Sequence, residues 1–141
     1  MPYILDGAQI EEQGPLLKMK TELNEEREER IAMEIIVDAY GPEEQAMGWY
    51  YYLKDTVEFP FSAVCFAARS ISPLKINDKV IVLGMAHEEE CEKEMFVSIR
   101  WAKGELAVPL SQLTPINSTT EETKEAIEDW HYWVHRGYQL C

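Results

Sequence analysis

Carboxylate side chains in this chain are concentrated in three short stretches that alternate with apolar and aromatic runs. Of the 26 acidic residues, 20 lie at 25–58, 88–94 and 121–129. Aromatic runs at 49–52 and 130–133 lie within and beside these stretches. A folded domain that crowds carboxylates suffers self-repulsion, which solvent screening, a basic partner or hard cations with oxygen ligands can relieve. We expect the aromatic runs to pack against each other in the core, which leaves the choice among these three forms of relief as the functional question.

Length and charge limit the classes of protein to which the chain can belong. A chain of 141 residues with 46% hydrophobic and 11% aromatic content is typical of one folded domain rather than a disordered acidic tail. Its net charge of -13 and pI of about 4.6 disfavour nucleic acid and anionic membrane as partners. We expect residues 24–141 to form the domain and residues 1–23, which show no clear period, to be a loosely ordered leader.

Cysteine usage indicates a reducing compartment. Cys65, Cys91 and Cys141 are odd in number, far apart and form no Cys-x-x-Cys unit. The sequence contains no apolar run near the roughly 20 residues that a membrane span requires, and its N-terminus lacks the features of a signal peptide. We therefore expect a soluble, cytoplasmic protein.

Two helices are predicted in the first half of the domain. Asn24 is a favourable N-cap, and an apolar face continues from it to about Tyr40, where Gly41-Pro42 ends the helix. Pro42 then occupies the favoured first position of a second helix that continues to about Asp55.

The second half is predicted to contain strands and one more helix. Strands are expected at 63–67, 79–84, 95–101 and 106–109, the last two forming a hairpin through Lys103-Gly104. A final helix is expected from the N-cap Thr119, with Glu122 as its capping-box partner, to Gly137. This order predicts an α+β fold with two N-terminal helices, a small antiparallel sheet, an SH3-like barrel being one form of it, and a C-terminal helix.

The corner between the first two helices is the main candidate for a cation site. Glu34 and Asp38 are four residues apart and project from one side of the first helix, while Glu44 opens the next helix just beyond the corner. Ca²⁺ takes about six to eight oxygen ligands, which carboxylates, carbonyls and water at such a corner can supply. The simpler alternative is a solvated acidic face. No EF-hand loop occurs, so any calcium ligands must come from separate elements.

Three further acidic groups are candidate ligands. Asp55 and Glu58 flank the end of the second helix and can join a site where the chain turns. The run 87–94 is a candidate for a second, looser calcium site. Asp129 follows Glu125 by four residues on the last helix, and its position beside Trp130 also suits a partly buried hydrogen-bond acceptor. Glu28, by contrast, is expected to be a solvated bystander.

Several motifs together resemble the small cyanobacterial calcium-binding protein family typified by CcbP. The resemblance covers roughly residues 25–138 and is carried by Glu34-Ile-Ile-Val-Asp38-Ala-Tyr40, Glu44, Gly48-Trp49-Tyr50-Tyr51-Tyr52-Leu53, Phe59-Pro60-Phe61, Gly84-Met85-Ala86, Glu90-Cys91, Met95-Phe-Val-Ser-Ile-Arg-Trp101, Leu106-Ala-Val-Pro-Leu110 and Asp129-Trp130-His131-Tyr132-Trp133. It implies an acidic cytosolic protein that binds Ca²⁺ through sites other than EF-hands and buffers free calcium. Among the matching positions, Asp38 is the strongest ligand candidate and Glu44 follows it. The Gly41-Pro42 corner departs from the more acidic sequence expected there.

Two other functions remain as alternatives to a calcium buffer or sensor. The acidic face can dock a basic protein partner, which makes metal affinity incidental. The His131 and His135 pair, with His87 and Cys91, offers nitrogen and sulfur ligands for zinc or for a metal-dependent hydrolase. Because the sequence contains no Gly-x-Ser-x-Gly, P-loop, dinucleotide-binding or His-Glu-x-x-His motif, we expect the protein not to be an enzyme.

Overall fold

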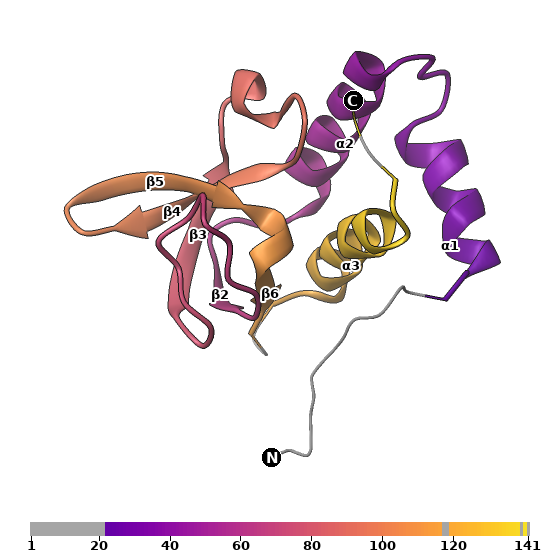
Figure 1. The fold of residues 1–141 in the computed structure, drawn as a ribbon. Helices are drawn as coiled ribbons and strands as arrows, with labels where there is room; N and C mark the ends of the chain where they lie inside the picture. The colour runs from indigo at the N-terminus through magenta and orange to yellow at the C-terminus, as the bar shows by residue number, and fades with distance from the viewer. Residues whose placement is uncertain (1–21, 117–118, 139, 141) are drawn as a thin grey trace.

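The computed structural model describes residues 22–116, 119–138 and 140. Most of the expected leader, residues 1–21, and Cys141 lie outside the described residues. The elements follow one another as α1 (Glu25–Arg30), η2 (Ile31–Ile35), α2 (Pro42–Thr56), β2 (Phe61–Cys65), β3 (Lys79–Met85), η3 (Glu88–Cys91), β4 (Phe96–Trp101), β5 (Gly104–Pro109), η4 (Leu110–Gln112), β6 (Leu113–Pro115) and α3 (Glu121–His135) (Figure 1).

The strands form one antiparallel sheet of five strands in the order β5-β4-β3-β2-β6. The three α-helices gather on one side of it, and the β4–β5 hairpin projects away from them (Figure 1). The predicted α+β fold is thereby confirmed. Strands β5 and β6 are the two edges, and no pairing between them among the described strands closes the sheet into a barrel. None of the described helices is both long and apolar enough to cross a membrane.

Tryptophan side chains from α2 and α3 form the centre of the core. Trp49 and Trp130 are fully buried, and their ring centroids lie 5.1 Å apart in an edge-to-face arrangement. The ring centroid of Trp133 lies 5.6 Å from that of Trp49. The prediction that the two aromatic runs pack against each other is confirmed. Such contacts contribute about 0.5–1.5 kcal/mol each beyond the burial of area, so they fix α2 and α3 firmly against each other.

The first helix is shorter than predicted. It ends in the π-helical turn η2 at Ile35 instead of continuing to Tyr40, because Ile36 leaves helical geometry (φ −113°, ψ 27°) and Asp38 has a left-handed φ of 59°. Helix α2 crosses close by, since a Cβ on Gly48 would lie 2.4 Å from the Ile35 carbonyl oxygen. The chain therefore turns before the Gly41-Pro42 corner, and Asp38 lies in a loop.

Other boundaries differ by small amounts. Helix α2 begins at Pro42 and the β4–β5 hairpin turns near Lys103-Gly104, as predicted. The N-cap of α3 is Thr120 rather than Thr119, and its side chain accepts a hydrogen bond from the Thr123 backbone N–H. Gly137, with φ of 97°, follows the end of α3 as expected.

Candidate metal centre

The loop between η2 and α2 places two of the predicted ligands at one corner. Asp38 is exposed, and its left-handed backbone helps the chain to reverse after the Ile36 carbonyl accepts a hydrogen bond from Ala39 N–H at 3.1 Å. The Glu44 carboxylate accepts a hydrogen bond from Tyr40 N–H at 2.6 Å. Because Tyr40 is two residues after Asp38, this bond holds the carboxylate of Glu44 against the same turn.

A groove of about 480 Å³ between η2 and α2 brings together two further candidates. Glu34 and Asp55 line it, together with Tyr51 and Tyr52. The carboxylates of Glu34, Asp38 and Asp55 are exposed, and no described residue forms an ion pair or hydrogen bond with them. Their oxygens are therefore available to a cation.

Glu58 lies beyond the end of α2 and does not line this groove. Its backbone N–H donates to the Thr123 hydroxyl at 2.9 Å, which ties the turn after α2 to the start of α3. The carboxylate itself is exposed. The structure thus places Asp55 with Glu34, whereas the sequence paired it with Glu58.

Asp129 is the centre of a buried polar network that joins all three α-helices. Its fully buried carboxylate accepts hydrogen bonds from both terminal nitrogens of the Arg30 guanidinium, each at 2.7 Å, and forms an ion pair with Arg27 at 3.1 Å. The Tyr52 hydroxyl donates to it at 2.8 Å. The expectation that Asp129 accepts hydrogen bonds in a buried setting is confirmed. Both oxygens already have cationic partners, so this carboxylate is an ion-pair partner here rather than a free oxygen ligand.

The network changes the acidity of its members and reaches the groove. The hydrogen bond to Asp129 is the main cause that raises the pKa of Arg30, and burial, followed by the same carboxylate, raises the pKa of Tyr52. Tyr52 also lines the groove that contains Glu34 and Asp55. Sequence spacing could not reveal this network, because Arg30 and Asp129 are 99 residues apart.

Glu28 is not the solvated bystander that the sequence suggested. Its carboxylate accepts hydrogen bonds from the hydroxyls of Tyr132 at 2.8 Å and Tyr138 at 3.0 Å, and lies 3.7 Å from the Arg136 guanidinium. The expectation of a solvated side chain was wrong because partners from α3 and the chain after it enclose this face of α1, while the slight effect of Glu28 on calcium affinity stays a prediction. Glu29, whose exposed side chain forms no ion pair or hydrogen bond with the described residues, is the better control for a residue away from the site.

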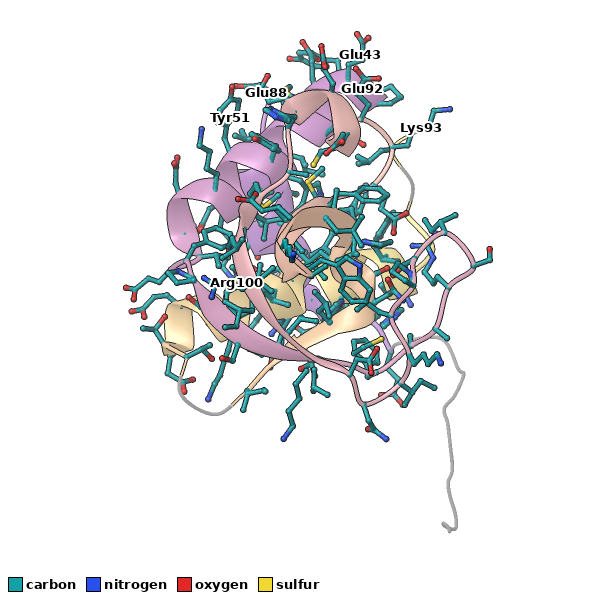
Figure 2. All side chains as sticks on the ribbon, turned by 90° about the vertical axis from the view of Figure 1, so that its left-hand side faces the viewer. Glu43, Tyr51, Glu88, Glu92, Lys93 and Arg100 are labelled. Atoms are coloured by element: carbon teal, nitrogen blue, oxygen red, sulfur yellow. The ribbon has the colours of Figure 1, made fainter. Side chains whose placement is uncertain are left out.

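Acidic side chains also gather where the start of α2 lies beside η3. Figure 2 shows Glu43, Glu88 and Glu92 at this end of the molecule. The Tyr51 hydroxyl donates to the Glu88 carboxylate, and this hydrogen bond is the main cause that raises the pKa of Tyr51. In the same loop, burial raises the pKa of Cys91 to about 11, so its sulfur is a protonated thiol rather than a thiolate ligand at neutral pH.

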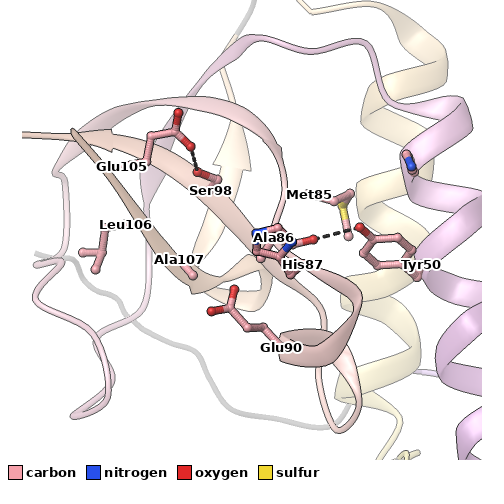
Figure 3. A pocket seen from close by; sticks show the side chains of 10 residues that line it. Tyr50, Met85, Ala86, His87, Glu90, Ser98, Glu105, Leu106 and Ala107 are labelled. Carbon is pink, nitrogen blue, oxygen red and sulfur yellow. Dashed lines mark hydrogen bonds between the residues drawn. The ribbon is translucent and has the colours of Figure 1, made fainter.

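A separate pocket of about 460 Å³ lies between α2, the η3 loop and the β4–β5 hairpin (Figure 3). Two of its polar groups are already satisfied. The Ser98 hydroxyl donates to Glu105 at 2.7 Å, and the Tyr50 hydroxyl donates to the Ala86 carbonyl at 2.9 Å. The first bond connects β4 to β5 and the second connects α2 to the residue after β3, so both stabilise the walls of the pocket.

His131 takes part in packing. Its Nε2 lies 2.7 Å from the Leu113 carbonyl oxygen, so it carries the proton and donates to β6. The ring stacks on His135 with centroids 6.1 Å apart. Burial lowers the pKa of His131 to about 4, against the opposing effect of the carbonyl. With Nε2 engaged by β6, only Nδ1 of His131 is left without a hydrogen-bond partner among the described residues, and it is buried.

The exposed carboxylates at the corner and in the groove offer the oxygen ligands that hard cations take. Among the described residues, no three His, Cys, Asp or Glu side chains converge closely enough to form a metal cluster. Zinc in proteins is held by clustered Cys and His side chains, whereas Ca²⁺ takes carboxylate, backbone carbonyl and water oxygens in flexible geometry. The free oxygens of Asp38, Glu34 and Asp55 therefore suit calcium better than zinc.

Fold and charge together define a small acidic α+β protein with exposed carboxylates at the η2–α2 corner. The chain belongs to the calcium-binding family typified by CcbP, because the profile of this family, described as calcium binding, matches residues 29–134. The crystal structure of Anabaena CcbP is similar, with 46% sequence identity and a TM-score of 0.73 over 84% of this chain and 96% of that one. A calcium-binding protein solved in its calcium-binding form has 44% identity and a TM-score of 0.72 over 82% and 94% of the two chains. No curated protein matches significantly.

Proposed function

We propose that this protein binds Ca²⁺ at the η2–α2 corner through sites other than EF-hands. The observation that carries the proposal is the exposed, unpaired carboxylate of Asp38, held in a left-handed turn beside Glu44, in a chain of the calcium-binding family. A structural neighbour solved in its calcium-binding form supports the same ligand.

Each residue of the corner has a distinct proposed role. Asp38 is the principal ligand, because its carboxylate is free and its turn leaves backbone carbonyls nearby. Glu44 is a second ligand, which its hydrogen bond to Tyr40 N–H orients before the ion arrives. Glu34 and Asp55 supply charge from the neighbouring groove, and water completes the coordination shell. Glu58, beyond the end of α2, remains a candidate ligand outside the groove. Asp129 holds together the helices that carry the other ligands.

The proposed role in the cell is that of a cytoplasmic calcium buffer or sensor without enzymatic activity. Oxygen ligands gathered at a flexible corner from side chains of unequal length suit an affinity on the order of 10⁻⁷ to 10⁻⁵ M, which is the range of calcium sensors. Binding also relieves part of the self-repulsion in a chain of net charge -13.

Isothermal titration calorimetry tests the proposal. Calcium added to the full chain at fixed salt should give heat with a near-integer stoichiometry. Millimolar Mg²⁺ should displace it only weakly, because Mg²⁺ demands near-ideal octahedral geometry and releases water reluctantly. Equal displacement by Mg²⁺, or little calcium heat at all, would contradict a dedicated site and favour the acidic surface as a docking face for a basic protein.

A further inference from the structure

Basic side chains gather at one end of the sheet although the chain is strongly acidic. Within the described residues, the basic side chains that take part in no ion pair or ring contact are Lys75, Lys79, Lys93, Arg100 and Lys103. Strand β3 begins at Lys79 and β4 ends just after Arg100, and the two strands are antiparallel. The start of β3, the end of β4 and the turns beside them therefore lie together, which places all but Lys93 at this end.

A groove of about 320 Å³ crosses the sheet at this end. It is lined by Ser62, Lys79, Val80, Ile81, Arg100 and Ile116. Along β3, exposed Lys79 and Ile81 alternate with buried Val80 and Val82, so the exposed pair faces away from the core. Figure 1 shows the three α-helices gathered on the other side of the sheet. The groove therefore offers two cationic groups without an ion pair, beside aliphatic side chains, on a face that the described helices leave uncovered.

An exposed apolar side chain lines this groove. Ile81 is 39% exposed and lies in it together with Ile116. Exposed apolar groups beside charge are typical of interaction sites, and Arg is enriched among the residues that contribute most to binding.

The charge distribution favours a small acidic partner segment over a polyanion. Figure 2 shows Glu43, Glu88 and Glu92 together at one end of the molecule, and Arg100 apart from them on the sheet. A nucleic acid or an anionic membrane extends well beyond the groove and meets the field of a chain with net charge -13. A short segment with a few carboxylates contacts only the basic end.

We propose that this groove docks a segment of a partner protein in which aliphatic side chains are flanked by carboxylates. The aliphatic side chains pack on Ile81 and Ile116, and the carboxylates pair with Lys79 and Arg100. Because the groove crosses the strands, side chains rather than backbone pairing provide the recognition. This interaction is independent of the proposed calcium site.

A model peptide tests the proposal. Acetyl-Glu-Leu-Glu-Leu-Glu-amide should shift the amide resonances of Ser62, Ile81 and Ile116 in the full chain, and the analogue with Lys in place of Glu should not. The variant Arg100→Glu should weaken binding ~tenfold, because it replaces attraction by repulsion at the groove. Lys93→Glu is the matched control, since it makes the same charge change at an exposed, unpaired residue outside the groove, and should weaken binding less than about twofold.

Four results would overturn the proposal. The first is the absence of shifts at these amides, and the second is an equal loss of affinity in the Lys93→Glu control. The third is tighter binding of a single-stranded oligonucleotide to the same amides, which would assign the groove to nucleic acid. The fourth is a dimer, detected by sedimentation, that Arg100→Glu dissociates, because a second copy would then be the occupant. Circular dichroism checks that each variant remains folded.

Discussion

Replacing Asp129 by Asn should destabilise the protein more than replacing any exposed carboxylate. Asn keeps the shape of the side chain but removes the charge that pairs with Arg30 and Arg27 inside the helix junction. Removal of one partner from a buried ion pair costs about 3–5 kcal/mol. Since the two arginine side chains are 28% and 18% exposed and can partly rehydrate, we expect about 3 kcal/mol. For a domain of this size this corresponds to a decrease of about 10 °C in Tm.

Urea unfolding followed by circular dichroism, without calcium and at pH 7, measures this loss. Tyr52→Phe removes only the hydroxyl that donates to Asp129, so it should cost about 1 kcal/mol. Glu128→Gln is the control, because this exposed carboxylate lies 3.6 Å from Arg27 and such pairs contribute less than about 1 kcal/mol. A loss below 1 kcal/mol for Asp129→Asn, or one equal to that of Glu128→Gln, would refute the view that this network holds the helices together.

Two further predictions concern calcium and pH. Calcium at a hundredfold excess over Kd should stabilise the folded chain by about 2.7 kcal/mol. Thermal melts should therefore show a larger rise in Tm with CaCl₂ than with NaCl of equal ionic strength. Equal rises in Tm would indicate that calcium acts only by screening charge. The folded-state pKa of His131, about 4, is below its ordinary value of 6.5, so stability is fully present above pH 6.5 and decreases as the pH falls toward 4, by up to about 3 kcal/mol. Urea unfolding of His131→Gln between pH 7 and 4.5 should show a smaller decrease than the unchanged protein; identical slopes would exclude His131 as the cause.

Local signals predicted most of the fold. Proline at the first position of α2, Lys103-Gly104 in the hairpin and the aromatic runs each act within a few residues, and the structure confirms all three. The end of the first helix was missed because it depends on a long-range contact, the close approach of Gly48 to the Ile35 carbonyl. Strand β6 has three residues, too few to produce a periodic pattern.

The candidate site was predictable only in part for the same reason. The corner acids could be found from their spacing, because a helix–turn–helix corner brings residues together that are close in sequence. The groove shared by Glu34 and Asp55, and the arginine partners of Asp129, arise from packing between separate helices. Spacing along one helix cannot tell a free carboxylate from one that is enclosed by cations.

Titration of two charge-matched variants tests the central claim most directly. Asp38→Asn and Glu29→Gln each remove one negative charge from an exposed, unpaired side chain, but only the first lies in the turn beside Glu44. Calcium calorimetry at fixed salt should show an affinity loss of tenfold or more, about 1.4 kcal/mol, for Asp38→Asn, and only a slight loss for Glu29→Gln. Comparable losses in the two variants would mean that calcium condenses diffusely on an acidic surface, and Asp38 would then have no special role.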